Sequence, residues 1–230
     1  MSRLLLSILA VLLNILTPAF ADVFTDAMAA YNRGDYSTAF PLMQTSAEAG
    51  LPMAQYELGY MYAEGQGVAQ DFAQAVAWYR KAADQGDAPA QFSLGEMLAK
   101  GRGVLPDSTQ AALWYRKAAN QGHILAQYAL GVMYAEGNGV AQDFVSAIFW
   151  YHKAAEQGFV PAQRDLGVLY FEGRGVARSA VQALVWLNLA SAGGDASVID
   201  ARDRIAAQMS AVQIAEAQRL TREWKLKPVR

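Results

Sequence analysis

The chain has 230 residues, of which 53% are hydrophobic and 17% are charged, and it contains no cysteine. It is long and apolar enough for one sizeable core, and this composition excludes intrinsic disorder as its main state. The net charge of −2 comes without any polycationic tract, so we expect neither nucleic acid nor anionic lipid as the main partner.

Residues 1–21, MSRLLLSILAVLLNILTPAFA, have the parts of a secretory signal: Arg3, an apolar run over Leu4–Leu16, and small residues up to Ala21. The run is shorter than the ~20 apolar residues of a membrane span, so we expect cleavage after Ala21 and no membrane insertion afterwards. An uncleaved anchor is the alternative. The signal predicts a periplasmic or secreted protein, and without cysteine its stability must come from packing alone.

Residues 22–50 are predicted to form a short capping helix hairpin, with Gly34-Asp35-Tyr36 as its turn. After it, the sequence repeats every 36 residues. The decapeptides AEGQGVAQDF (63–72) and AEGNGVAQDF (135–144) are nearly identical. An interval of this length indicates an array of stacked supersecondary units. We place four units within 51–194, at 51–86, 87–122, 123–158 and 159–194.

Each unit is predicted to contain two antiparallel helices, here called A and B in chain order. In the first unit Ala54, Leu58 and Tyr62 recur at helical spacing in helix A, and Trp78 and Tyr79 belong to the apolar stripe of helix B. The tryptophans fall in one column of the repeat, and packing is their expected role.

The repeated decapeptide is interpreted as the connection between helices A and B. Gly65 and Gly67 permit the positive φ with which a helix commonly ends, and Asp71 is placed to accept a hydrogen bond from the free amides that begin helix B. Its counterparts are Asp107, Asp143 and Ser179. Beyond the last unit, residues 195–230 are predicted to form C-terminal capping helices, one near 196–208 and one opening at Ser210.

The motifs A-x-x-x-L-G-x-x-Y, G-x-G-V-x-x-D and A-x-x-W-Y-x-K-A-A-x-x-G together resemble the Sel1-like repeat, a relative of the tetratricopeptide repeat. The departures are local: Leu98 replaces a tyrosine, Ser179 an aspartate, and Trp186-Leu187 a Trp-Tyr pair. The resemblance implies an all-α fold, an α-solenoid of antiparallel helix hairpins in a right-handed superhelix. It also implies that the A helices line the concave side.

Catalytic and cofactor motifs are missing from the sequence. The glycine-rich loops lack the third glycine of GxGxxG and the lysine of a P-loop, and no G-x-S-x-G occurs. The two histidines, His123 and His152, have no second ligand at metal spacing, and His152 shares the column of Arg80 and Arg116, where we expect a solvated face. We therefore predict no cofactor, no metal site and no enzyme activity.

One stripe of each A helix varies between units beside the fixed Ala, Leu and Gly columns. Its positions are spaced as 53, 57, 60 and 64. Positions that stay the same in every unit are expected to stabilise the fold, whereas positions that vary can discriminate between partners. The alternative is that variation marks unconstrained solvent-facing positions; Glu64, Glu136 and Glu172, which share a column, suit solvated helix ends. The candidate groove residues are Met53, Glu57, Tyr60, Glu64, Ser93, Glu96, Lys100, Val132, Glu136, Asp165 and Glu172.

The pattern favours an exported, non-catalytic scaffold that binds a protein or peptide partner through the concave face of its solenoid. A second hypothesis comes from cysteine-rich members of the family, which are associated with penicillin binding or β-lactamase activity; the paired cysteines of those repeats are absent here. A third hypothesis is a purely structural envelope protein.

Overall fold

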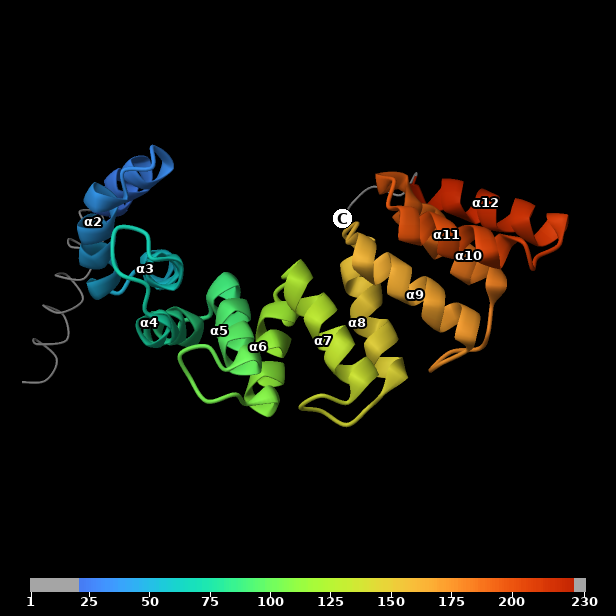
Figure 1. Ribbon diagram of the computed structural model, residues 1–230, viewed down its shortest axis with the longest axis horizontal. Helices are drawn as coiled ribbons and strands as arrows, with labels where there is room; N and C mark the ends of the chain where they lie inside the picture. The colour runs from blue at the N-terminus through green and yellow to red at the C-terminus, as the bar shows by residue number, and fades with distance from the viewer. Residues whose placement is uncertain (1–20, 226–230) are drawn as a thin grey trace, which may run out of the picture. The chain divides into compact units, whose positions relative to one another are not determined.

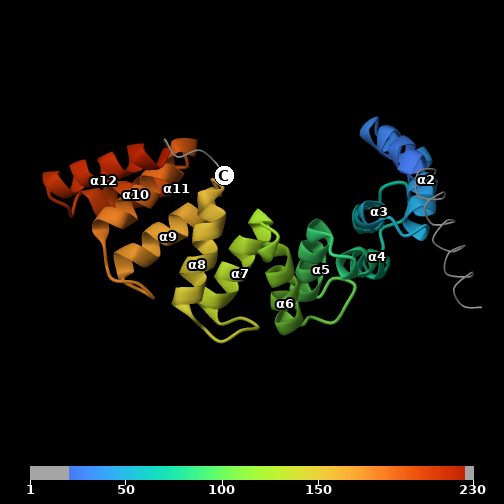
Figure 2. The same cartoon turned by 180° about the vertical axis from the view of Figure 1, so that it is seen from behind.

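The computed structural model describes residues 21–225 and divides the chain into two compact units, one ending at Asp107 and one beginning at Ser108 (Figures 1 and 2). Apart from Ala21, the proposed signal lies outside the described residues. The part of the chain that is described contains helices and no strand, so the predicted all-α class is confirmed. Within residues 21–225 no helix has the length and apolar character that crossing a membrane requires.

The first unit contains a helical segment over residues 21–32 and four helices, each of which packs against the next along the chain from α2 to α5 (Figure 1). Its core is formed by Met43 of α2, Leu58 and Met61 of α3, and Trp78 of α4. The helices are α2 (Tyr36–Glu48), α3 (Pro52–Glu64), α4 (Phe72–Asp84) and α5 (Ala88–Lys100).

The second unit continues the same alternation through α9 and α10 and ends in two further helices. In it α7 packs on α8, α8 on α9 and α9 on α10, while α11 and α12 both contact α10. Its elements are α6 (Ser108–Asn120), α7 (Ile124–Glu136), α8 (Phe144–Glu156), α9 (Val160–Glu172), α10 (Ala180–Ala190), the short 3₁₀ helix η1 (Ser191–Gly193), α11 (Ala196–Ala206) and α12 (Ala211–Lys225).

The loop between helices A and B needs its two glycines for different reasons. Gly65 ends α3 in the left-handed conformation at φ 70°, as predicted. Gly67 also has positive φ, and a Cβ there would lie 2.2 Å from the carbonyl oxygen of Tyr36. The second glycine therefore lets the loop lie against the start of α2, the helix that occupies the place of a helix B before the first repeat. The sequence pattern did not reveal this contact.

The predicted N-caps of α4, α8 and α10 are present. Asp71 Oδ1 accepts hydrogen bonds from the amides of Ala73 and Gln74 at 2.9 and 3.0 Å. Asp143 caps α8 in the same way, and Ser179 Oγ accepts from the Gln182 amide at 3.2 Å, so serine replaces aspartate without loss of the cap.

A buried glutamine in every repeat joins helix A to the end of the preceding B-type helix. These glutamines are 4–6% exposed, and each side-chain amide donates to a carbonyl oxygen near that end at 3.1–3.2 Å. The same carbonyls also accept a hydrogen bond from the amide of the glycine after the helix at 3.0 Å, so the glutamine uses their second acceptor site. The sequence analysis assigned no role to this column, which consists of Gln55, Gln91, Gln127 and Gln163.

Candidate functional site

The varied stripe is divided between the two compact units, and each part is described by itself. The α3 and α5 positions belong to the first unit, and the α7 and α9 positions belong to the second. We therefore describe two candidate surfaces rather than one groove.

On α3 the stripe changes from exposed to half-buried and back to exposed. Met53 is 61% exposed, and Glu64 is exposed at the end of the helix. Between them, Glu57 and Tyr60 are half-buried. Since they stand three residues apart on one helix, they present a carboxylate and a phenol to the same region.

Burial raises the pKa of the Glu57 carboxyl above its usual range, and the neighbouring charge of Asp87 raises that pKa further. Asp87 is occupied as the N-cap of α5, where its Oδ1 accepts from the Ala90 amide at 2.8 Å. Within residues 21–225, the Glu57 carboxylate has no hydrogen bond and no ion pair. A half-buried carboxylate without a cation is costly in the free protein.

The remaining stripe positions of the first unit lie on α5 and have partners. Ser93 is near the Tyr56 hydroxyl of α3 and opposes the elevation of the Tyr56 pKa that burial causes. The Glu96 carboxylate forms an ion pair with Lys100 Nζ at 2.5 Å, and both side chains lie on one face of α5. A solvated pair four residues apart contributes only ~0.2–0.5 kcal/mol to a helix.

In the second unit, the stripe combines apolar and paired acidic positions. Val132 packs against the core cluster and is half-buried, while Glu136 is exposed. Glu172 is also exposed, and its carboxylate pairs with Arg174 at 2.9 Å. Two members of the predicted solvated glutamate column are therefore at the surface in this unit.

Asp165 of α9 carries the same repeat position as Glu57 but lies in a different electrostatic environment. Arg164 pairs with its Oδ1 at 2.8 Å, and the Tyr128 hydroxyl donates to its Oδ2 at 3.1 Å. Burial, with the nearby Asp165 charge, raises the pKa of Tyr128 to about 12, so this hydroxyl remains a donor at neutral pH.

The structure adds residues beside the stripe that the sequence analysis missed. Tyr56 and Tyr128 occupy one repeat column, and each is near the varied position of the next A helix: Tyr128 donates a hydrogen bond to Asp165, and Ser93 affects the pKa of Tyr56. The aromatic column was visible in the sequence, but its direction toward the stripe was not. Tyr31 also belongs to this region in the first unit, because the charge of Glu57 contributes to the elevation of its pKa, of which burial is the main cause.

The expectation that His152 lies on a solvated face is wrong. Its imidazole is half-buried, with Nε2 3.2 Å from the Tyr170 hydroxyl and the ring centroid 5.0 Å from that of Trp186. Arg80 and Arg116, in the same column, are exposed as expected. In the part of the chain that the structure describes, no three His, Asp or Glu side chains are grouped so that they could hold a metal ion.

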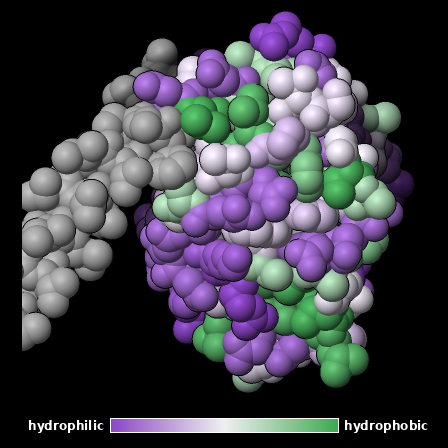
Figure 3. Space-filling view, turned by 90° about the vertical axis from the view of Figure 1, so that its left-hand side faces the viewer, coloured by the Kyte–Doolittle hydropathy of each residue, from purple (hydrophilic) through white to green (hydrophobic). Residues whose placement is uncertain are grey.

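On the face drawn in Figure 3, apolar residues (green) form separate patches among polar ones (purple). Large single apolar side chains at a surface are normal, whereas an extended patch would indicate a hydrophobic interface. The face drawn therefore shows no single extended apolar patch.

The helix pairs, capped loops and glutamine column define a protein built of helical hairpin repeats. The family model described as Sel1 repeat matches residues 52–87, 88–123, 124–159 and 160–195. The chain therefore belongs to the Sel1 repeat family. Each matched repeat begins one residue later than the unit placed from the sequence.

Two solved structures support this assignment. A protective antigen of uropathogenic Escherichia coli strains, displaying an SLR fold, is 31% identical with a TM-score of 0.81, over 90% of this chain and 46% of that one. The chain thus spans less than half the length of that antigen. A Sel1 repeat protein from Oxalobacter formigenes is 35% identical with a TM-score of 0.72, over 77% of this chain and 70% of that one. No curated protein matched the chain.

Proposed function

We propose that the protein is an exported, non-catalytic scaffold that binds a segment of another protein through the varied stripe of its A helices. Sel1 repeats are generally protein-interaction modules, and this chain has four of them. The main support for this proposal is a difference between columns of the repeat. The fixed columns are used in packing and capping, whereas the side chain in the column of Glu57, Ser93 and Asp165 changes its chemical type from repeat to repeat. Differences at equivalent positions allow a repeat surface to select one partner.

The proposed site in the first unit combines an aromatic side chain with charged ones. Tyr60 is half-buried beside Glu57 on α3, and the Glu96–Lys100 pair lies on α5. Interface energy concentrates in a few aromatic or charged residues, whose truncation often costs ~2 kcal/mol or more. We expect Tyr60 to be the main anchor of this surface.

A photo-crosslinking amino acid placed at position 60 tests this in the native cell, with position 80 as the matched control. Arg80 is exposed on α4 of the same compact unit and is not part of the stripe. We expect a specific crosslinked protein from position 60 and none from position 80, and Glu96→Lys should reduce its yield. Crosslinking from position 80 alone would place the binding surface on the B helices and refute the proposal.

The same crosslinked material tests export. If the signal is removed as proposed, mass spectrometry of the product should give an N-terminal peptide beginning at Asp22, recovered from the envelope or medium. A peptide beginning at Met1 would instead support an uncleaved anchor.

A further inference from the structure

The carboxylates of the stripe fall into two environments. Glu64 and Glu136 are exposed at helix ends, where water solvates them. The half-buried carboxylates are those of Glu57, Glu96 and Asp165. Two of these three have a cation from this chain: Lys100 pairs with Glu96 at 2.5 Å, and Arg164 pairs with Asp165 at 2.8 Å.

Glu57 is the exception among the half-buried carboxylates of the stripe, because no described cation is paired with it. Its electrostatic neighbours are Asp87, which has the same sign, and the tyrosines Tyr31 and Tyr56. Burying a charge without a partner destabilises the folded state, and sites that bind charged ligands commonly tolerate this cost. The chemistry that is missing at Glu57 is a positive charge.

Two of the tyrosines around Glu57 are held in place by contacts of their own. The Tyr31 hydroxyl donates a hydrogen bond to Gln66 Oε1 at 2.8 Å. The Tyr56 ring packs on Tyr79, with centroids 5.7 Å apart. Fixed aromatic rings beside a carboxylate suit a cation, since a ring face attracts positive charge and side chains already ordered lose little entropy on binding.

We infer that the Glu57 patch, formed by Tyr31, Tyr56, Glu57 and Tyr60, receives a lysine or arginine side chain of the bound protein segment. This inference rests on the proposed function and specifies its partner: the segment carries a basic residue that pairs with Glu57 and lies against the tyrosine rings. The contrast with Asp165 supports a partner's cation here, because the same repeat position in the second unit is neutralised by Arg164 of this chain.

Panning of the full chain with a phage-displayed library of random dodecapeptides tests the inference. We expect the selected peptides to share a lysine or arginine at a constant position. A synthetic copy of a selected peptide should bind Glu57→Gln at least about tenfold more weakly than wild type, the loss expected when one partner of a desolvated charge pair is removed. Asp84→Asn, which removes an exposed carboxylate of α4 outside the stripe, is the matched control and should keep wild-type affinity.

Replacing the basic residue of the peptide by norleucine completes a double-mutant cycle. If the two groups pair, this replacement weakens binding to wild type but has little further effect on Glu57→Gln. The variant should also melt at the same temperature as wild type or above it at neutral pH, because the substitution removes a half-buried unpaired charge. Weak binding can then be distinguished from loss of structure.

The outcomes separate this inference from the proposed function. Peptides that lack a basic residue, or that bind Glu57→Gln as tightly as wild type, overturn the Glu57 assignment; if Tyr60→Ala still abolishes their binding, the stripe remains the binding surface. Binding that is unchanged by both substitutions, or a failure to select any peptide, overturns the stripe as a peptide site and the assignment with it.

Discussion

The His152 imidazole lies between two aromatic rings, with its centroid 6.1 Å from that of Tyr170 and 5.0 Å from that of Trp186. Burial lowers the pKa of His152 below its ordinary value of 6.5, although the charge of Glu156 opposes this effect. The folded chain therefore resists protonation at a site that the unfolded chain protonates readily. The neutral His152 imidazole therefore contributes stability that is fully present above the pKa of this group in the unfolded chain. That contribution is lost as the pH falls through the lower pKa of the folded chain.

We accordingly predict that acid destabilises the wild type more than a His152→Gln variant. The melting temperatures of the two proteins, measured from pH 8 to pH 5, should differ progressively below about pH 6.5, the ordinary histidine pKa. Carboxylates titrate in both proteins, so the difference between the two curves isolates the imidazole. Parallel curves over this range would show that His152 is accessible to protons in the folded chain.

At the scale of the helix pair, Gly59 determines how closely α3 and α4 approach. A Cβ at this position would lie 2.7 Å from Cδ1 of Tyr79 and 3.2 Å from the Ala75 carbonyl oxygen. The Tyr79 ring is only 2% exposed and has little room to move. Gly131 faces Tyr151 in the same way in the second unit, so the close approach recurs in the repeat.

We expect Gly59→Ala to lower the free energy of unfolding. Overpacking costs roughly 1–3 kcal/mol, which outweighs the gain of up to about 1 kcal/mol that alanine brings to a helix. Urea denaturation measures the change. The control is Gly193→Ala, since Gly193 has no atom within 4 Å of its added Cβ and no positive φ. Equal unfolding midpoints for Gly59→Ala and wild type would contradict a close contact at this position.

The elements were largely predictable from the sequence because their signals are local. Asp71 caps a helix by bonding amides two and three residues away, and Gly65 ends one through its own φ. The glutamine column was not predictable: Gln127 bonds the Ala119 carbonyl on another helix, and a polar residue in a helical pattern gives no sign of that. The candidate stripe positions follow from helical spacing, but their partners depend on tertiary contacts, as Arg164 and Tyr128 at Asp165 show.

At the scale of the whole molecule, an array of hairpins must close its apolar ends. In the second unit α12 covers α10, where Val185, Trp186 and Leu189 are 4%, 2% and 9% exposed, and Trp224 lies 4.8 Å from Trp186 between ring centroids. The equivalent of Val185 in the preceding repeat, Phe149, is 52% exposed. Burial of this face of α10 therefore depends on the C-terminal helix.

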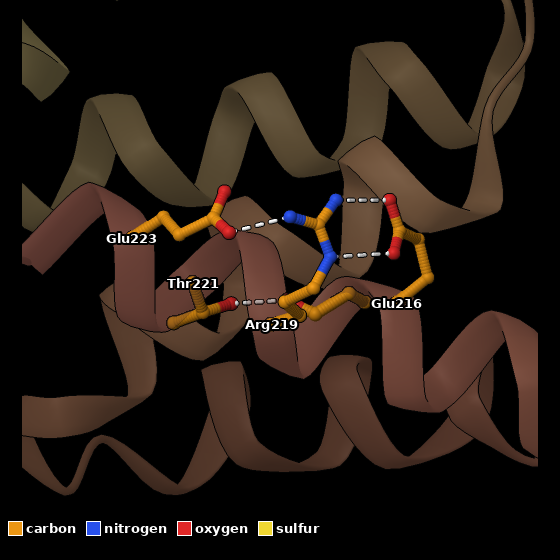
Figure 4. Close-up of polar contacts among 5 residues, drawn as sticks. Glu216, Arg219, Thr221 and Glu223 are labelled. Atoms are coloured by element: carbon orange, nitrogen blue, oxygen red, sulfur yellow. Dashed lines mark hydrogen bonds and ion pairs between the residues drawn. The ribbon is translucent and has the colours of Figure 1, made fainter.

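The other side of α12 carries charge. Arg219 lies between Glu216 and Glu223 and forms ion pairs with both, at 2.7 Å to Glu216 (Figure 4). The buried Thr221, also drawn there, donates its hydroxyl to the Ala217 carbonyl of the same helix at 2.7 Å. Exposed ion pairs of this kind contribute little to stability. The helix thus has an apolar side that covers the array and a charged side that faces water.

Deleting residues 210–230 should leave a folded array with an exposed apolar end. Each apolar side chain returned to water costs about 1.5–3 kcal/mol, so we expect a lower melting temperature, stronger binding of a hydrophobic dye and self-association in light scattering after gel filtration. Arg219→Ala, which changes only the charged side of α12, should behave like wild type in all three measurements. If the truncated chain stays monomeric and melts as wild type does, α12 does not cap the array, and the buried face of α10 must be protected by α11 and the preceding repeat.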